Sequence, residues 1–242
     1  EHDLNKYGNR FSLLFYTLTY DDQLRHMRDK KVYELASQSG ILKEIDNAID
    51  QYLPYAMSYK TNSYSSRSIN YQIKITKKLI ESNMNTIKNT LEYSKAYINV
   101  LQQGNKMTFE VIPDSIAEIK FSDLRLNLNQ AYSGKLTFIY KKKDNTTLTR
   151  HTTVASKTNS IDLSEFVRDI YFSAGLDENL HPEKRKYTLE IIFDESEKIT
   201  IGNIDIGMKN DITGKDINKD DIYMQIADGN DYYDISGFKF EA

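Results

Sequence analysis

The sequence contains no cysteine, and it has only 3 prolines and 10 glycines among its 242 residues. Without cysteine the chain forms no disulfide, no thiolate zinc site, no cysteine nucleophile and no cysteine-ligated iron–sulfur cluster. This absence does not identify a compartment. Cytosolic proteins, virion components and proteins secreted by Gram-positive bacteria can all lack cysteine.

A dominant charge of one sign is also absent. The chain has 32 basic and 35 acidic residues and a formal net charge of -3. Non-specific binding to nucleic acid depends on an excess of Lys and Arg, which releases counterions from the phosphates. We therefore expect no nucleic-acid partner.

Long hydrophobic runs are missing as well. The longest apolar segment is Phe11–Tyr20, about ten residues, whereas a membrane-spanning helix needs about twenty. Acidic residues precede this segment and no small-residue cleavage site follows it, so we expect neither a membrane span nor a signal peptide. Because the sequence begins without methionine, we expect it to belong to a larger protein.

The spacing of apolar residues predicts helices in residues 1–104. Apolar residues in 40–53 recur at steps of three and four, which predicts a helix that Pro54 ends. A polar loop is expected at 59–68. From residue 69 to 101 a heptad pattern predicts a helix of about 33 residues that packs against another helix or a second copy of the chain. Gly104 stands where a helix cap is expected, and residues 1–36 carry no clear pattern.

After Gly104 the apolar period changes to two, which is typical of short strands separated by polar turns. A short helix is also expected at 160–167. The predicted fold class is therefore α+β with two domains: a helical hairpin or bundle over 1–104 and an antiparallel, jelly-roll-like β-sandwich over 105–242. The predicted strands are 107–112, 117–121, 124–127, 134–141, 148–155, 169–173, 186–193, 198–206, 221–226 and 233–240.

Local catalytic motifs are not evident. The sequence has no HExxH, GxSxG, GxGxxG or Walker lysine loop. Its four histidines, His2, His26, His151 and His181, are scattered, and a functional histidine needs a partner within reach. We expect no enzymatic activity, although a glycosidase pair of carboxylates contributed by distant strands stays open.

One acidic run matches the beginning of a calcium loop. Asp216, Asn218 and Asp220 provide oxygen ligands at the required spacing, but Asp221 replaces the usual glycine and Ala227 the usual glutamate. A solvated acidic turn is the alternative interpretation. No cofactor other than this calcium is expected. A second acidic cluster follows nearby, with Asp228, Asn230, Asp231 and Asp234.

Tyrosine is abundant, with 18 residues, while tryptophan is absent. An exposed tyrosine presents a flat apolar face and a hydroxyl group to a sugar ring. Tyrosines on strands also pack in cores, so each is open to both interpretations. In the Tyr232-Tyr233 pair the two side chains point to opposite faces of a strand, so one should face outwards. The candidates for a glycan-binding surface are Tyr232, Tyr233, Tyr132, Tyr140 and Tyr171.

Two neighbouring segments resemble a known family. Residues 187–193 (YTLEIIF) followed by 199–206 (ITIGNIDI) are similar to the paired late strands of jelly-roll modules of the carbohydrate-binding type. Such modules occur in secreted bacterial glycosidases, adhesins and the C-terminal parts of insecticidal crystal toxins. The resemblance covers roughly residues 107–208 and implies a β-sandwich that binds carbohydrate. Many sugar binders of this kind use tryptophan, which this chain lacks.

These patterns together predict a non-enzymatic binding or assembly module from a larger secreted bacterial toxin or adhesin. The β-sandwich is expected to bind a glycan or a cell-surface protein receptor, and the helix at 69–101 to join copies of the chain into a homo-oligomer. One alternative is a phage or virion structural protein, such as a tail or receptor-binding component. Another is a hydrolase whose carboxylates the sequence does not identify.

Overall fold

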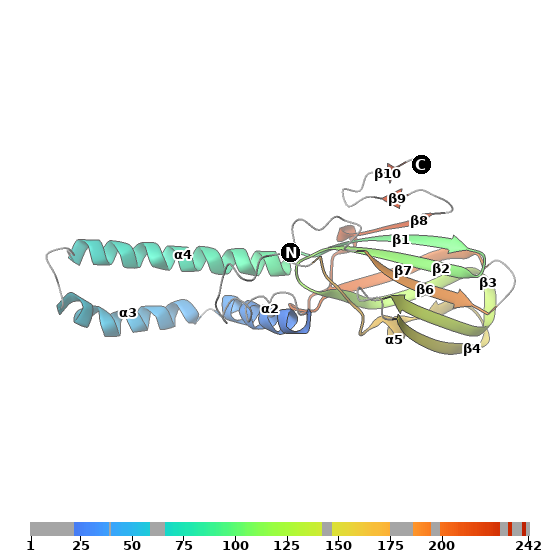
Figure 1. Ribbon diagram of the computed structural model, residues 1–242, viewed down its shortest axis with the longest axis horizontal. Coiled ribbons are helices and arrows are strands. Elements are labelled where there is room, and N and C mark those ends of the chain that lie inside the picture. The colour runs from blue at the N-terminus through green and yellow to red at the C-terminus, as the bar shows by residue number, and fades with distance from the viewer. Residues whose placement is uncertain are drawn as a thin grey trace, which may run out of the picture. The chain divides into compact units, whose positions relative to one another are not determined.

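The computed structural model describes residues 22–38, 40–58, 66–141, 147–174, 186–194, 199–227, 232–233 and 239–240. The chain divides into two compact units, Glu1–Glu92 and Tyr93–Ala242. The first is helical and the second is a strand-rich mixed sheet, which confirms the predicted order of a helical part followed by a β part (Figure 1). The boundary lies at Glu92 and not at Gly104 as predicted.

The helical unit contains three described helices, α2 (Asp22–Ser37), α3 (Ile41–Ser58) and α4 (Ser66–Glu92). The Tyr33 hydroxyl of α2 donates a hydrogen bond of 2.7 Å to Glu92 Oε1 of α4. Lys77 of α4 forms an ion pair with Asp46 of α3. None of the described helices is long and apolar enough to cross a membrane.

Several helix boundaries differ from the prediction. Pro54 lies inside α3, which continues to Ser58. Because proline has no N–H, the helix lacks one main-chain hydrogen bond at this position. Helix α4 has 27 residues and ends at Glu92, so residues 95–101 are strand and not helix. Of the loop predicted at 59–68, residues 59–65 lie outside the described part and 66–68 begin α4.

The β unit contains an eight-stranded hydrogen-bonded sheet with the strand order β4-β3-β6-β2-β1-β8, in which β5 and β7 also pair with β3, and a separate two-stranded sheet. Strand β8 runs parallel to β1 and the other pairs in this sheet are antiparallel, so the predicted all-antiparallel arrangement is wrong. The parallel pairing arises because the chain enters β8 at the end where β1 begins. The strands are β1 (Lys95–Gln103), β2 (Lys106–Asp114), β3 (Ile119–Lys141), β4 (Thr147–Asp162), β5 (Tyr171–Phe172), β6 (Tyr187–Phe193), β7 (Ile201–Asn210) and β8 (Ile222–Ala227).

Gly104 is a turn residue and not a helix cap. Gln103 at the end of β1 pairs with Lys106 at the start of β2, which leaves Gly104 and Asn105 as a two-residue hairpin loop. Gly104 has a φ of 61°. Such loops need positive φ, which glycine adopts without steric cost.

Strand β3 connects most of the sheet. Its first half pairs with β7 and its second half with β6, while β4 accompanies both halves. Register shifts occur between Phe121 and Asp123 and around Tyr132. Three predicted strands, 117–121, 124–127 and 134–141, are therefore parts of this single irregular strand.

The hydrophobic core lies within the β unit and draws side chains from all of the strands β1 to β7. Phe172 of β5 contacts Phe121 of β3 and Tyr187 of β6, with ring centroids 5.3 and 5.2 Å apart and edge-to-face geometry. Edge-to-face rings add specific packing to the burial of apolar area. Phe172 thus links the first half of β3 to β6.

The remaining short elements depart from the prediction in length. The helix expected at 160–167 is α5 (Ser164–Val167), because residues 160–162 still belong to β4. The strand expected at 233–240 consists of β9 (Tyr232–Tyr233) and β10 (Lys239–Phe240), which pair with each other. Residues 234–238 lie outside the described part.

Candidate functional site

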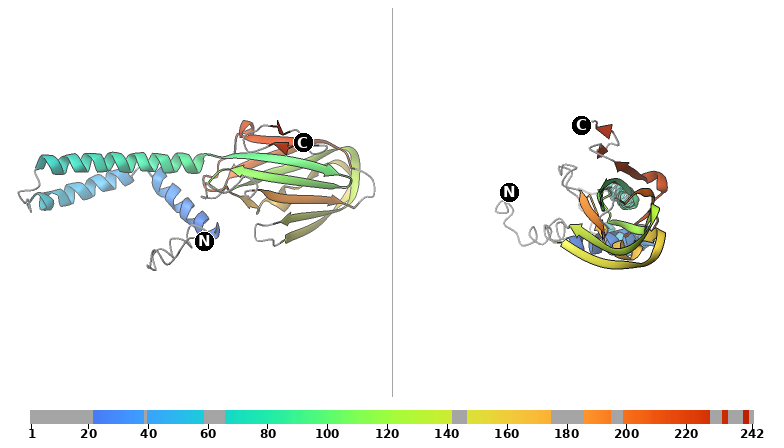
Figure 2. Two further views of the ribbon diagram at one scale, coloured as in Figure 1. Left: turned by 45° about the horizontal axis from the view of Figure 1, so that its top comes forward. Right: turned by 90° about the vertical axis from the view of Figure 1, so that its right-hand side faces the viewer.

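The outward side of β1, β2 and β8 carries a concentration of aromatic and polar side chains. Ala96, Ile98 and Val100 of β1 are buried in the core, so the alternate residues of β1 point outwards. Strand β8 lies beside β1 (Figure 2) and continues this surface in parallel register. We call the following set the tyrosine face: Tyr93, Lys95, Tyr97, Asn99, Glu110, Asp114, Asp221, Tyr223 and Gln225.

Two stacked rings lie on this face. Tyr97 of β1 pairs with Tyr223 of β8, and their ring centroids are 5.0 Å apart with planes inclined by 14°. The Tyr223 side chain is exposed, at 42%. In this stacked pair each ring covers one side of the other, and the exposed part of Tyr223 remains as apolar surface beside its hydroxyl group.

A lysine lies between two exposed tyrosines beside the stack. Lys95 Nζ is 5.9 Å from the ring centroids of both Tyr93 and Tyr223, and 3.5 Å from Asp221 Oδ1. Electrostatic interaction with Tyr223 and then with Tyr93 raises the pKa of Lys95, which keeps the ammonium charged. The Tyr93 hydroxyl donates a 2.9 Å hydrogen bond to Asp114 Oδ2. Partial burial and this hydrogen bond raise the pKa of Tyr93 to about 12, so the hydroxyl stays protonated.

Two buried carbonyl oxygens lie two residues further along β1 and β8, on the same side of the sheet. Asn99 is only 3% exposed although it points away from the core, and it pairs with Gln225. Asn99 Oδ1 and Gln225 Oε1 are both buried without a hydrogen-bond partner. A buried acceptor without a donor costs free energy, of the order of 1–3 kcal/mol. Because both oxygens are buried, a ligand on this face would contact the exposed groups around them and not the oxygens themselves.

A carboxylate completes the second row. Glu110 of β2 pairs with Asn99 and accepts a 2.7 Å hydrogen bond from Lys186 Nζ. Further along the same side of the sheet, Glu190 accepts hydrogen bonds from Lys106 at 2.7 Å and Lys141 at 3.0 Å. Burial favours the neutral carboxyl, but the two lysines outweigh it and lower the pKa of Glu190. Each of these carboxylates is thus paired with lysine, so the positive and negative charges on this side of the sheet offset each other locally.

Chemically, the tyrosine face combines apolar ring surface with hydrogen-bonding groups of both kinds. The rings of Tyr93 and Tyr223 offer apolar contact, Lys95 is a donor, and the carboxylates of Asp114 and Asp221 are acceptors. A sugar presents an apolar ring side and several hydroxyl groups, which suit this combination. The nearby carboxylates Asp114 and Asp221 are engaged by Tyr93 and Lys95 respectively.

Two of the tyrosines predicted for a glycan surface lie in the core. Tyr132 is fully buried, donates a 2.7 Å hydrogen bond to the Lys135 carbonyl and packs edge-to-face on Phe193 at 5.1 Å. Tyr140 is also buried. The prediction is wrong for both, because their positions in β3 put them on the core side of the alternation.

The other predicted tyrosines have different outcomes. Tyr171 of β5 is exposed, at 39%, and Lys120 Nζ lies 5.0 Å from its ring centroid, so it does not join the tyrosine face. Strand β9, formed by Tyr232 and Tyr233, lies against β1. The side chains of these two residues lie outside the described part, and the prediction for them stays untested.

The predicted calcium ligands are exposed, and one of them caps a turn. Asn218 Oδ1 accepts a hydrogen bond from the Asp220 main-chain N–H at 3.3 Å and caps the short 3-10 helix Lys219–Asp221. Asp216 forms an isolated β-bridge with Lys209. The described residues contain no group of three or more His, Cys, Asp or Glu side chains that could hold a metal. In the second acidic cluster, Asp228, Asn230, Asp231 and Asp234 lie outside the described part.

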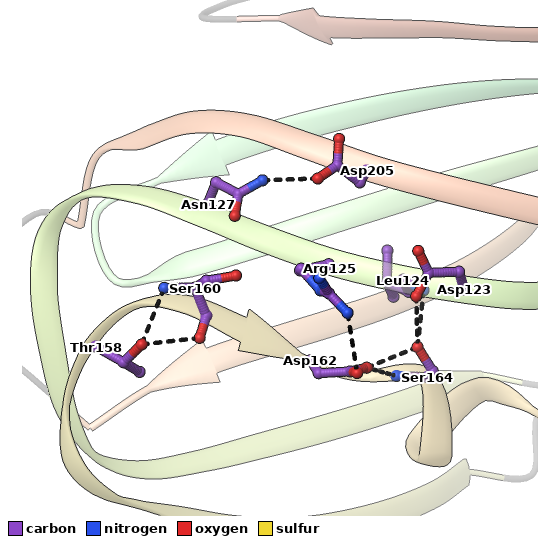
Figure 3. A network of polar contacts seen from close by, with 9 residues as sticks. All are labelled: Asp123, Leu124, Arg125, Asn127, Thr158, Ser160, Asp162, Ser164 and Asp205. Atoms are coloured by element: carbon purple, nitrogen blue, oxygen red, sulfur yellow. Dashed lines mark hydrogen bonds and ion pairs between the residues drawn. The ribbon is translucent and has the colours of Figure 1, made fainter.

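A second polar network lies where β3, β4 and α5 meet (Figure 3). Ser164 Oγ lies 2.6 Å from Asp162 Oδ1 and 2.9 Å from Asp123 Oδ1, and it accepts a 3.1 Å hydrogen bond from the Leu124 N–H. Hydrogen bonds from Ser164, with a smaller contribution from Arg125, lower the pKa of Asp162. These bonds hold α5 against the irregular part of β3, so we assign this network a structural role.

Most of the tyrosine face was not predicted from the sequence, because Tyr97 and Asn99 fall within the predicted helix at 69–101 but lie in β1. Two signals would have found them. Ala96, Ile98 and Val100 alternate with polar or aromatic residues, and Gly104-Asn105 is a typical two-residue hairpin turn.

Comparison with known proteins gives no further assignment. No protein-family model matches the chain, and no curated protein or solved structure matches it. The geometry of the site is therefore the basis for assigning a function.

Proposed function

We propose that the protein is a non-enzymatic binding module whose β unit recognises a glycan through the tyrosine face. The observation that carries the proposal is the pair of exposed rings at Tyr93 and Tyr223 with the Lys95 ammonium between them. A bound sugar would place its apolar side on the rings and its hydroxyl groups against Lys95 and the neighbouring carboxylates of Asp114 and Asp221. The likeness of residues 187–206 to jelly-roll sugar-binding modules supports the same ligand class and a larger secreted bacterial toxin or adhesin as the setting.

We also propose that the sheet closes into a jelly-roll-like sandwich. Its support is the change of partners along β3, whose first half pairs with β7 and whose second half pairs with β6. A strand shared in this way forms a corner between two layers. The contacts of Phe172 with Phe121 and Tyr187 are those expected between the facing layers.

Glycan binding can be tested by screening the full chain and two variants on a glycan array. Tyr223→Ala removes one ring of the stack and is expected to abolish the signal of the wild-type protein. Tyr171→Ala is a matched control, because Tyr171 has nearly the same exposure and also a lysine over its ring. It should leave binding unchanged.

Three outcomes contradict the proposal. These are a silent array with the folded wild-type protein, loss of binding with the Tyr171 variant alone, and an unchanged signal with Tyr223→Ala. Capture of a cell-surface protein without any glycan dependence would instead identify a protein receptor.

A further inference from the structure

The helical unit has little core of its own. Among its described residues, Leu91 is the only apolar side chain that is buried. An amphipathic helix is stable in water when its apolar stripe packs against another element. Exposed large apolar side chains are instead spread over all three helices, at Met27, Leu35, Tyr52, Tyr55, Tyr71, Leu79 and Ile87.

Helix α4 presents apolar residues on two opposite sides. Ile73 and Ile80 line an apolar groove of about 440 Å³ together with Ile45 and Ile49 of α3. Tyr71 and Leu79 are 61% and 57% exposed. At 100° per residue they lie on the side of α4 away from Ile73. Both α2 and α3 contact α4, and Tyr71 and Leu79 are still exposed, so α4 keeps an apolar side that neither helix covers.

The charges of α3 and α4 indicate which partner would cover that side. Helix α3 has three acidic residues and one basic residue, a net charge of -2, whereas α4 has five basic and two acidic residues, a net charge of +3. Within one hairpin the two helices are already tied by the Lys77–Asp46 ion pair. A second copy of the hairpin offers both an acidic helix for α4 and a basic helix for α3, whereas two α4 helices side by side would repel each other.

We propose that two chains associate through their α3–α4 hairpins to form a four-helix bundle, in which each α3 lies next to the α4 of the partner chain. Figure 1 shows α3 and α4 side by side in the hairpin that would be doubled. Lengths of 18 and 27 residues, about 27 and 40 Å of helix, are sufficient for several layers of bundle packing. This assembly is independent of glycan binding by the β unit.

The first test measures the mass of the full chain in solution by sedimentation equilibrium over a wide range of concentrations. The proposal predicts a dimer of twice the 28.2 kDa chain mass. Ile73→Asp places a charge in the groove and should shift the protein to monomer. Asn85→Asp adds the same charge at an exposed polar position of α4 and should leave the dimer intact.

A second test does not depend on the hairpin tolerating a charge in its groove. Lys74→Glu with Lys78→Glu makes α4 acidic, and Glu44→Lys with Asp50→Lys makes α3 basic. Each double variant alone should dimerise about tenfold more weakly. A mixture of the two should recover dimers that contain one chain of each kind. A wild-type monomer at all concentrations, a trimer, or a mixture without hetero-dimers would overturn the proposal.

Discussion

Replacing Tyr132 with phenylalanine separates a core role from a binding role for this residue. The Tyr132 hydroxyl donates to the Lys135 carbonyl at 2.7 Å and accepts from the Asp194 N–H at 3.2 Å, and this N–H also donates directly to the Lys135 carbonyl at 3.0 Å. Tyr132→Phe removes the hydroxyl but leaves the two main-chain groups paired with each other, so the loss is expected to cost about 0.5–1.5 kcal/mol of unfolding free energy. In a unit of this size that corresponds to a fall in melting temperature of about 1–6 °C.

The assay is thermal unfolding of the full chain, followed by near-ultraviolet circular dichroism. Tyr223→Phe is the control, because it removes a hydroxyl from an exposed ring and should change stability by less than about 0.5 kcal/mol. Gly134→Ala should also destabilise the β unit. Its added Cβ would lie 2.8 Å from the Tyr132 hydroxyl, and the backbone φ at residue 134 is 153°. A Tyr132→Phe protein as stable as the wild type, but unable to bind glycan, would refute the core assignment.

Three further predictions concern charged groups. The lysine partners of Glu190 lower its pKa from 4.5, so the ionised carboxylate stabilises the folded protein above pH 4.5 and this stabilisation is lost as the pH falls through the lowered pKa. Glu190→Gln should therefore make the stability of the protein depend less on pH on the acid side. Asp114→Asn should lower the pKa of Tyr93 from about 12 towards 10, as measured by NMR titration of the labelled ring. Arg150 donates to both carboxylate oxygens of Asp169, so Arg150→Lys should destabilise the β unit despite keeping the charge, and equal melting temperatures would contradict this.

The helices show that the period of apolar residues predicts where a helix lies but not the residue at which it ends. Apolar spacing correctly predicted the helix around Ile45 and the start of the next one near Ile69. The heptad then continued by coincidence from Leu91 to Ile98, which lies seven residues later but in β1. Gly104 strengthened the error, because a glycine with positive φ serves a helix cap and a hairpin turn equally well.

The β unit shows a different limit. Alternation predicted β2, β6 and β8 closely, because each has one side in the core. The parallel pairing of β1 with β8 is a contact between residues more than a hundred positions apart, and no local pattern encodes it. The tyrosine face depends on that pairing, since it brings Tyr223 to Tyr97 and Gln225 to Asn99.

The most direct test of the tyrosine face follows the side-chain amide signals of Asn99 and Gln225 by NMR. The ligand added is the glycan that gives the strongest array signal with the wild-type protein. If the sugar binds on the tyrosine face, next to these two residues, both amide signals should shift and saturate together with the signals of Tyr223. Saturable shifts confined to residues around Tyr171, with Asn99 and Gln225 unchanged, would contradict the account.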